Sequence, residues 1–120
     1  MPATGLLVIL DCPTATLNIH GTNDDVIAYN GSSEVISAPD ATAFWAAQNN
    51  AQPTPSITAS TTTSYDIEHI RYEQGDSSVT SEHIKVLGGG HVWFRFEENG
   101  ASMNTLIWEF FNRFDIYGAR

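Results

Sequence analysis

The sequence predicts an α/β fold in which a sheet of about four strands, with a hairpin toward its C-terminal side, is covered by two main helices. Two patterns predict this class: short apolar or alternating segments typical of strands, and two segments that start and repeat like helices. The chain has 120 residues, of which 42% are hydrophobic. That length is typical of one domain, so residues 1–120 are expected to share one core.

Two strands are expected near the N-terminus. Residues 5–10, GLLVIL, form a short apolar run that is typical of a strand buried on both faces. Residues 15–20 form a second strand, which Gly21 ends. No Lys or Arg precedes the first run and Asp11 follows it directly, so it lacks the features of a signal peptide and the compartment stays open.

Two helices are expected, one in the middle of the chain and one near its end. The first covers residues 39–50, because Ser37 and Asp40, three residues apart, form a typical helix start. The second covers residues 102–114, with Ser102 as its N-cap. Its apolar residues recur at spacings of three and four and define one wide buried face: Met103, Leu106, Ile107, Phe110, Phe111 and Phe114.

The region between the helices predicts an antiparallel hairpin. Residues 65–73 and 80–87 both alternate between apolar and polar side chains, and a polar turn separates them. His69 and His83 lie in the middle of these strands and are expected to be exposed cross-strand residues. Residues 51–64, rich in Pro, Thr and Ser, are expected to form an ordered surface loop.

The composition excludes several classes of function. The net charge is −9, with only five Lys and Arg, so binding to nucleic acid or to an anionic membrane surface is not expected. No segment approaches the length of a transmembrane helix. The single cysteine, Cys12, excludes an internal disulfide framework and a CxxC metal site.

The stretch LGGGHVWF, residues 87–94, could be a phosphate cradle, a loop that carries a metal ligand, or a turn that aims a catalytic base. A phosphate-binding loop needs a GK[ST] sequence and a helix that begins at the glycines, and this sequence has neither. A metal site needs three or four suitably spaced ligands, whereas the four histidines are scattered. We therefore expect no metal ion and no cofactor, and His91 is left as a catalytic base.

Carboxylates follow the strand at 15–20, as Asp24 and Asp25. In open α/β sheets, functional groups gather beyond the carboxyl ends of strands. Aspartates in turns also bond their own backbone, so this segment alone leaves both interpretations open. His91 lies beyond the end of the strand at 80–87. Asp24 and His91 together match the acid and the base of a Ser-His-Asp system, in which the aspartate orients the histidine that moves the proton.

Four segments, in this order, resemble the C-terminal part of the polyhydroxybutyrate-depolymerase-like and feruloyl-esterase-like α/β-hydrolases: LNIHGTNDDVIAYNG, DATAFWAAQNN, IKVLGGGHVWF and LIWEFFNRF. They cover most of residues 16–114. The resemblance implies a partial α/β-hydrolase sheet with Asp24 as the catalytic acid and His91 as the catalytic histidine. It also implies that Trp93 and Tyr29 lie at the substrate pocket.

The sequence departs from this family in two respects. The family usually has proline where Asp25 and Ala28 stand, a change that would relax the acid loop without removing the acid. The larger departure is the nucleophile elbow, G-x-S-x-G, which does not occur before Asp24. The serines that follow the acid lie in polar, loop-like sequence, and Pro13 follows Cys12, so none of these residues is expected to be a nucleophile: Ser32, Ser33, Ser37 and Cys12.

These observations predict a truncated, esterase-like or depolymerase-like α/β-hydrolase that keeps the acid and the histidine and is inactive or weakly active alone. Two alternatives stay open: a small esterase whose nucleophile comes from a partner chain, and a non-catalytic binding or assembly module. The resemblance suggests a secreted bacterial protein and an ester substrate. A half sheet leaves an edge strand and helix faces uncovered, so a homodimer is expected. A stable monomer in gel filtration at low micromolar concentration would contradict it.

Overall fold

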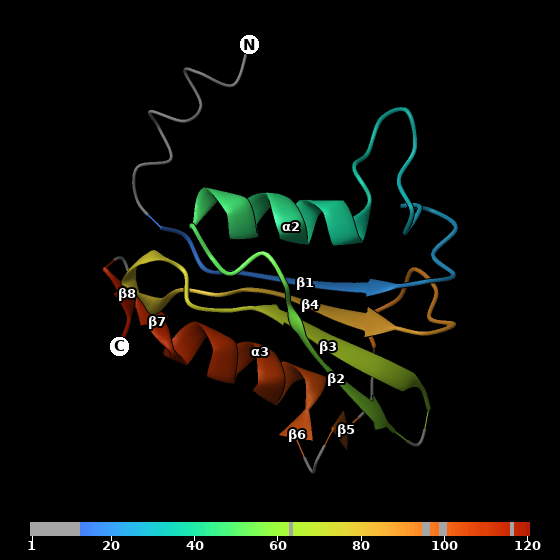
Figure 1. The fold of residues 1–120 in the computed structure, drawn as a ribbon. Helices are drawn as coiled ribbons and strands as arrows, with labels where there is room; N and C mark the ends of the chain where they lie inside the picture. Colours follow the sequence, from blue (N-terminus) through green and yellow to red (C-terminus); the bar gives the residue numbers. More distant parts are fainter. Residues whose placement is uncertain (1–12, 63, 95–96, 99–100, 116) are drawn as a thin grey trace.

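The computed structural model describes residues 13–120 except 63, 95–96, 99–100 and 116. A four-stranded mixed sheet in the order β1-β4-β3-β2 forms the centre of the molecule, with α2 on one face and α3 on the other (Figure 1). The predicted α/β class is thus confirmed. The main elements are β1 (Thr16–Gly21), α2 (Ala38–Gln48), β2 (Ser56–Thr61), β3 (Asp66–Tyr72), β4 (Ser81–Val86) and α3 (Met103–Asn112).

Short elements complete the described fold. One 3-10 turn precedes β4, and two small two-stranded sheets flank α3, β5 with β6 before it and β7 with β8 around its end. Their bounds are η1 (Asp76–Ser78), β5 (Glu97–Glu98), β6 (Ala101–Ser102), β7 (Phe114–Asp115) and β8 (Gly118–Ala119). The strand predicted at residues 5–10 lies outside the described residues.

The sheet topology determines where the site can form. β3 and β4 pair antiparallel, as the predicted hairpin requires, whereas β1 and β4 pair parallel. The segment between β1 and β4 contains α2 and the β2–β3 hairpin, which is long enough for the crossover that a parallel pair needs. Gly21 pairs with Val86 at the end of the register. Both strands therefore deliver the residues that follow them to the same edge of the sheet.

The prediction that residues 51–64 form a surface loop is wrong, because β2 lies within this segment. Residues Ser56–Thr61 pair with β3 along the whole strand and form one edge of the sheet. Most of its side chains are exposed, so the apolar alternation that marks a half-buried strand is missing. The β-branched residues Ile57, Thr58 and Thr61 nevertheless favour an extended backbone.

Both helices begin at the serines that the sequence indicates. The Ser37 hydroxyl accepts a hydrogen bond from the backbone N–H of Asp40, and Ser102 accepts one from Thr105, at 3.1 and 3.2 Å. α2 ends two residues earlier than predicted, at Gln48. The next residue, Asn49, uses its side-chain amide to bond both the N–H and the C=O of Thr14. This contact fixes the chain that leads into β1.

The hydrophobic core lies between the sheet and α3. Its buried residues are Ile67, Ile84, Val86, Phe94 and Met103, and partly buried side chains of β1 and α3 pack against them. Within the part of the chain that the structure describes, neither helix is long and apolar enough to cross a membrane.

The expected exposure of His69 and His83 is also wrong, because the two helices cover both faces of the inner strands. His83 is 0% exposed and His69 is 8% exposed. His83 donates from Nδ1 to the carbonyl of Asn18 at 2.9 Å, and its Nε2 accepts from the Tyr29 hydroxyl at 2.8 Å. Because a carbonyl can only accept, His83 is the neutral Nδ1–H tautomer. On the opposite face, His69 Nε2 lies 2.7 Å from the buried Glu82 carboxylate.

These buried groups predict a loss of stability in acid. Burial lowers the pKa of His83, so the unfolded chain binds a proton below about pH 6.5 that the folded chain excludes. Burial also opposes ionisation of Glu82, but hydrogen bonds from His69 and Thr80 and the charge of Arg113 outweigh it and hold the pKa at about 2. The stability that Glu82 contributes is present above its unfolded pKa and is lost as the pH falls toward 2.

We therefore expect the free energy of unfolding to fall steadily from pH 7 to pH 3. Glu82 contributes on the order of 2 kcal/mol to this fall, because pH 3 lies about 1.5 units below its unfolded pKa and each unit corresponds to about 1.4 kcal/mol. Urea denaturation followed by circular dichroism at pH 7, 5.5, 4 and 3 measures this change. A free energy that is constant or rises on acidification would contradict the buried neutral histidine and the buried carboxylate.

Candidate active site

Asp24 and His91 come together at the carboxyl ends of β1 and β4. Nδ1 of His91 lies 3.0 Å from Oδ2 of Asp24, although the two residues are 67 positions apart in the sequence. Each follows its strand by a short turn, and the parallel register brings both turns to one edge of the sheet. The carboxylate can only accept, so Nδ1 of His91 donates, and Nε2 has no hydrogen-bond partner among the described residues.

The loop after β1 holds Asp24 in its ionised form. Its Oδ1 accepts hydrogen bonds from the N–H groups of Val26 and Ile27, at 2.9 and 2.8 Å, which closes an Asx turn. Its side chain is 7% exposed. Desolvation opposes ionisation, but the two backbone donors and His91 outweigh it and lower the pKa of Asp24 to about 2. Asp24 is thus a fixed negative charge beside His91 at neutral pH.

Glycines allow the two turns to approach each other. A Cβ added to Gly21 would lie 2.1 Å from the carbonyl oxygen of Gly89, so no side chain fits there. Gly88 has φ of +78°, which L-residues with side chains rarely adopt, and its N–H bonds the hydroxyl of Thr22 at 2.8 Å. Asn23 donates to the Gly89 carbonyl at 2.8 Å. The glycine run therefore forms the turn that the sequence indicates.

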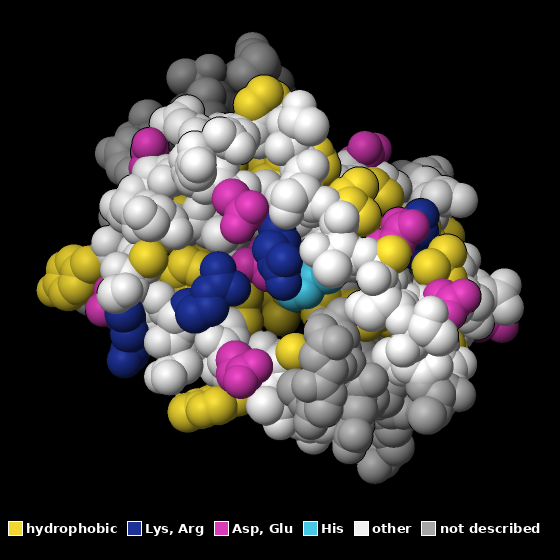
Figure 2. All heavy atoms as spheres, turned by 60° about the horizontal axis from the view of Figure 1, so that its bottom comes forward, with side chains coloured by type: hydrophobic (Ala, Val, Ile, Leu, Met, Phe, Trp, Pro, Cys, Tyr) yellow, Lys and Arg dark blue, Asp and Glu magenta, His cyan; other side chains and the backbone are white. Residues whose placement is uncertain are grey.

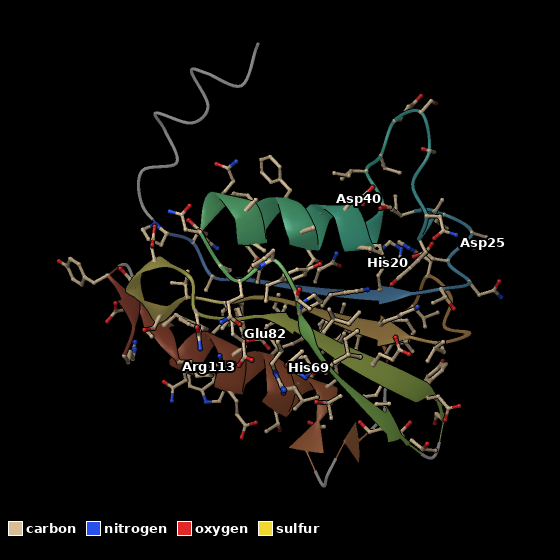
Figure 3. The ribbon with its side chains drawn as sticks, viewed as in Figure 1. His20, Asp25, Asp40, His69, Glu82 and Arg113 are labelled. Atoms are coloured by element: carbon tan, nitrogen blue, oxygen red, sulfur yellow. The ribbon has the colours of Figure 1, made fainter. Side chains whose placement is uncertain are left out.

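A second histidine, His20, lies on the same carboxylate. It is the last but one residue of β1, and its Nε2 lies 2.8 Å from the carbonyl of Ile27 and 3.3 Å from Oδ2 of Asp24 (Figure 3). The Ile27 carbonyl can only accept, so Nε2 of His20 carries the proton. Sequence analysis missed this role. The signal was the spacing of four residues between a histidine at a strand end and the acid in the following turn.

The acid and the two histidines line an open cleft of about 520 Å³. Trp93 and Val92 lie on its wall and are both 62% exposed, so an apolar surface adjoins His91. The indole N–H of Trp93 donates to the side chain of Asn104 at 3.1 Å, which links this wall to α3. Trp93, which the resemblance places near a substrate pocket, thus lines the cleft at His91.

Tyr29, the other residue expected at a substrate pocket, does not line this cleft. It is 6% exposed, and its hydroxyl bonds His83 beneath α2. Burial, together with the charge of Glu68, raises the pKa of Tyr29 to about 12, so the hydroxyl stays protonated and donates. The ring packs edge-on against His20 at 5.5 Å. Tyr29 therefore supports the site from behind instead of facing a ligand.

No described nucleophile lies at His91. The residues that line the cleft include no described serine, threonine or cysteine. Ser37 caps α2, and the Ser32 hydroxyl accepts from the N–H of Glu34 at 3.2 Å. Ser33 is exposed, and Cys12 lies outside the described residues. The described residues also contain no group of three or more side chains that could hold a metal ion.

Comparison with known proteins adds nothing to this geometry: no protein-family model, no curated protein and no solved structure matches the chain.

Proposed function

We propose that this chain carries the acid and the base of a carboxylic-ester hydrolase of the Ser-His-Asp type. Asp24 orients His91 and stabilises its protonated form, and Nε2 of His91 accepts a proton from a hydroxyl or a water molecule. The observation that carries the proposal is the 3.0 Å hydrogen bond from His91 to Asp24, with Nε2 unpaired among the described residues. The resemblance of the sequence to depolymerase-like and feruloyl-esterase-like hydrolases supports it.

Under this proposal, the chain alone has weak esterase activity or none. Without a positioned nucleophile the covalent step of a serine hydrolase is lost, and the histidine can only assist attack by water. The exposed apolar wall at Trp93 and the charge of Asp24 favour an uncharged ester over an anionic one.

Hydrolysis of p-nitrophenyl acetate at pH 8 tests the proposal. We expect slow turnover without an initial burst, no labelling by a serine-directed phosphonate, and a rate that His91→Ala lowers by on the order of 10²-fold. Asp24→Asn is expected to lower it similarly, because the histidine loses its orienting charge. Asp25→Asn is the matched control: Asp25 is exposed, adjacent in sequence and outside the cleft lining, so the rate should not change.

Two results would contradict the proposal. Turnover that is independent of His91, or equal effects of Asp24→Asn and Asp25→Asn, would show that Asp24 and His91 do not act as an acid–base pair. A burst together with phosphonate labelling of a serine would instead show a complete enzyme, and the claim that this chain lacks a nucleophile would fail.

A further inference from the structure

Two arginines meet beside one buried carboxylate on the α3 face of the sheet. Nη1 of Arg113 lies 2.9 Å from Oε2 of Glu82, and Nε of Arg71 lies 3.6 Å from Oε1. The Glu82 side chain is 1% exposed, whereas those of Arg71 and Arg113 are 34% and 47% exposed. Figure 3 shows His69, Glu82 and Arg113 between the sheet and α3. The guanidinium groups therefore form the outer layer over a buried acid.

A pocket of about 150 Å³ opens at these arginines. It is lined on the sheet side by Leu17 and Ile84 and on the α3 side by Leu106, all apolar. Figure 2 looks onto this side of the molecule and shows Lys and Arg side chains next to a histidine, with hydrophobic side chains in the hollow beside them. The pocket shares no lining residue with the cleft at His91.

The two arginines at the pocket share one carboxylate as their ion-pair partner. Two of the five Lys and Arg in the chain lie within 4 Å of a carboxylate that carries a single negative charge. Glu109 also lines the pocket and brings the formal charge of its lining to zero, but it forms no ion pair with either arginine among the described residues. The carboxylate of a ligand would give the two guanidinium groups a direct second partner, which Glu109 does not supply.

Unused hydrogen-bond donors point to the same ligand. A guanidinium group has five N–H donors. Arg71 donates from Nη2 to Nδ1 of His69 at 3.2 Å, and Arg113 donates from Nη1 to Glu82, so each uses one donor within the described structure. Arg113 is also held over the ring of Phe114 at 4.8 Å. Both guanidinium groups are thus held in position with unused N–H donors, and a planar carboxylate matches the geometry of those donors.

We propose that this pocket binds a small monocarboxylate with a short apolar tail. The carboxylate bridges Arg71 and Arg113, and the tail lies against Leu17, Ile84 and Leu106. The volume corresponds to about five water-sized groups, which suits a chain of three or four carbons. The site is separate from the proposed hydrolase chemistry and does not depend on it.

Titration of the ¹⁵N-labelled protein with butyrate at constant ionic strength tests the inference. We expect saturable shifts of the Arg71 and Arg113 Nε–H signals with a dissociation constant in the millimolar range, and no shift with butyramide, the neutral counterpart. Arg71→Gln should weaken butyrate binding at least tenfold, and Arg71→Lys should weaken it less. Lys85→Gln is the matched control, because Lys85 pairs with Glu68 and does not line the pocket.

Arg71 is the preferred position for substitution, since its contact with Glu82 is the longer of the two and the fold depends less on it. Melting curves recorded for each variant show that it is folded. Non-saturating shifts, equal shifts with butyramide or chloride, or unchanged affinity in Arg71→Gln would overturn the inference.

Discussion

Replacing Glu82 with alanine is expected to lower the free energy of unfolding by about 3–5 kcal/mol, the usual effect of removing one partner from a buried charge network. The carboxylate accepts hydrogen bonds from His69 and Thr80, at 2.7 and 2.6 Å, and pairs with Arg113. Without it, the two buried donors lose their acceptor, and Arg71 and Arg113 lose the counter-charge that they share. Urea denaturation at pH 7 measures the change.

An exposed ion pair on the same sheet provides the matched control. Glu68 lies 3.8 Å from Lys85, and both side chains are about one-third exposed. Glu68→Ala is therefore expected to cost less than about 1 kcal/mol. Glu82→Gln should fall between the two variants, because the amide keeps one acceptor but loses the charge. Equal effects of Glu82→Ala and Glu68→Ala would show that the network under α3 does not stabilise the fold.

Replacing Gly21 with alanine is expected to separate the two turns that carry Asp24 and His91. The added Cβ would lie 2.1 Å from the carbonyl oxygen of Gly89, and backbone cannot yield as a flexible side chain can. Overpacking of this kind costs about 1–3 kcal/mol. The larger consequence is local: the 3.0 Å hydrogen bond between His91 and Asp24 should be lost, and His91-dependent hydrolysis with it.

Gly90→Ala is the control in the same glycine run, because a Cβ there meets nothing within 4 Å. Its stability and its His91–Asp24 hydrogen bond should match those of the wild type. If Gly21→Ala kept that hydrogen bond, or if both variants lost it equally, the close contact of Gly21 with Gly89 would not be what positions the pair.

Local patterns predict much of this fold because they report local geometry. Ser37 and Ser102 cap the predicted helices, since a serine hydroxyl satisfies a backbone N–H two or three residues away. The hairpin of β3 and β4 follows from alternation and an intervening turn. The pairing of Asp24 with His91 follows from one further rule, that residues beyond the ends of parallel strands meet at one edge.

The incorrect predictions concern the exposure of side chains that distant residues bury. Alternation in β4 predicts one exposed face, but Glu82 and His83 are both buried because α2 and α3 cover opposite faces. Their partners lie far away in sequence: Arg113 is 31 positions from Glu82, and Tyr29 is 54 positions from His83. A polar side chain with a distant buried partner has the same local sequence pattern as an exposed one. The expectation that Tyr29 lies at the pocket came from the family resemblance, and its hydroxyl instead bonds the distant His83.

The central claim is that Asp24 orients His91, and the tautomer of His91 tests it most directly. The nitrogen that bears the proton is set by the hydrogen bond that the ring makes. Long-range ¹H–¹⁵N correlation spectra of the histidine side chains at pH 8 identify the tautomer. We expect the Nδ1–H form of His91 in the wild type and its loss in Asp24→Asn, with Asp25→Asn unchanged. A wild-type His91 in the Nε2–H form, or the same tautomer in Asp24→Asn, would contradict the account.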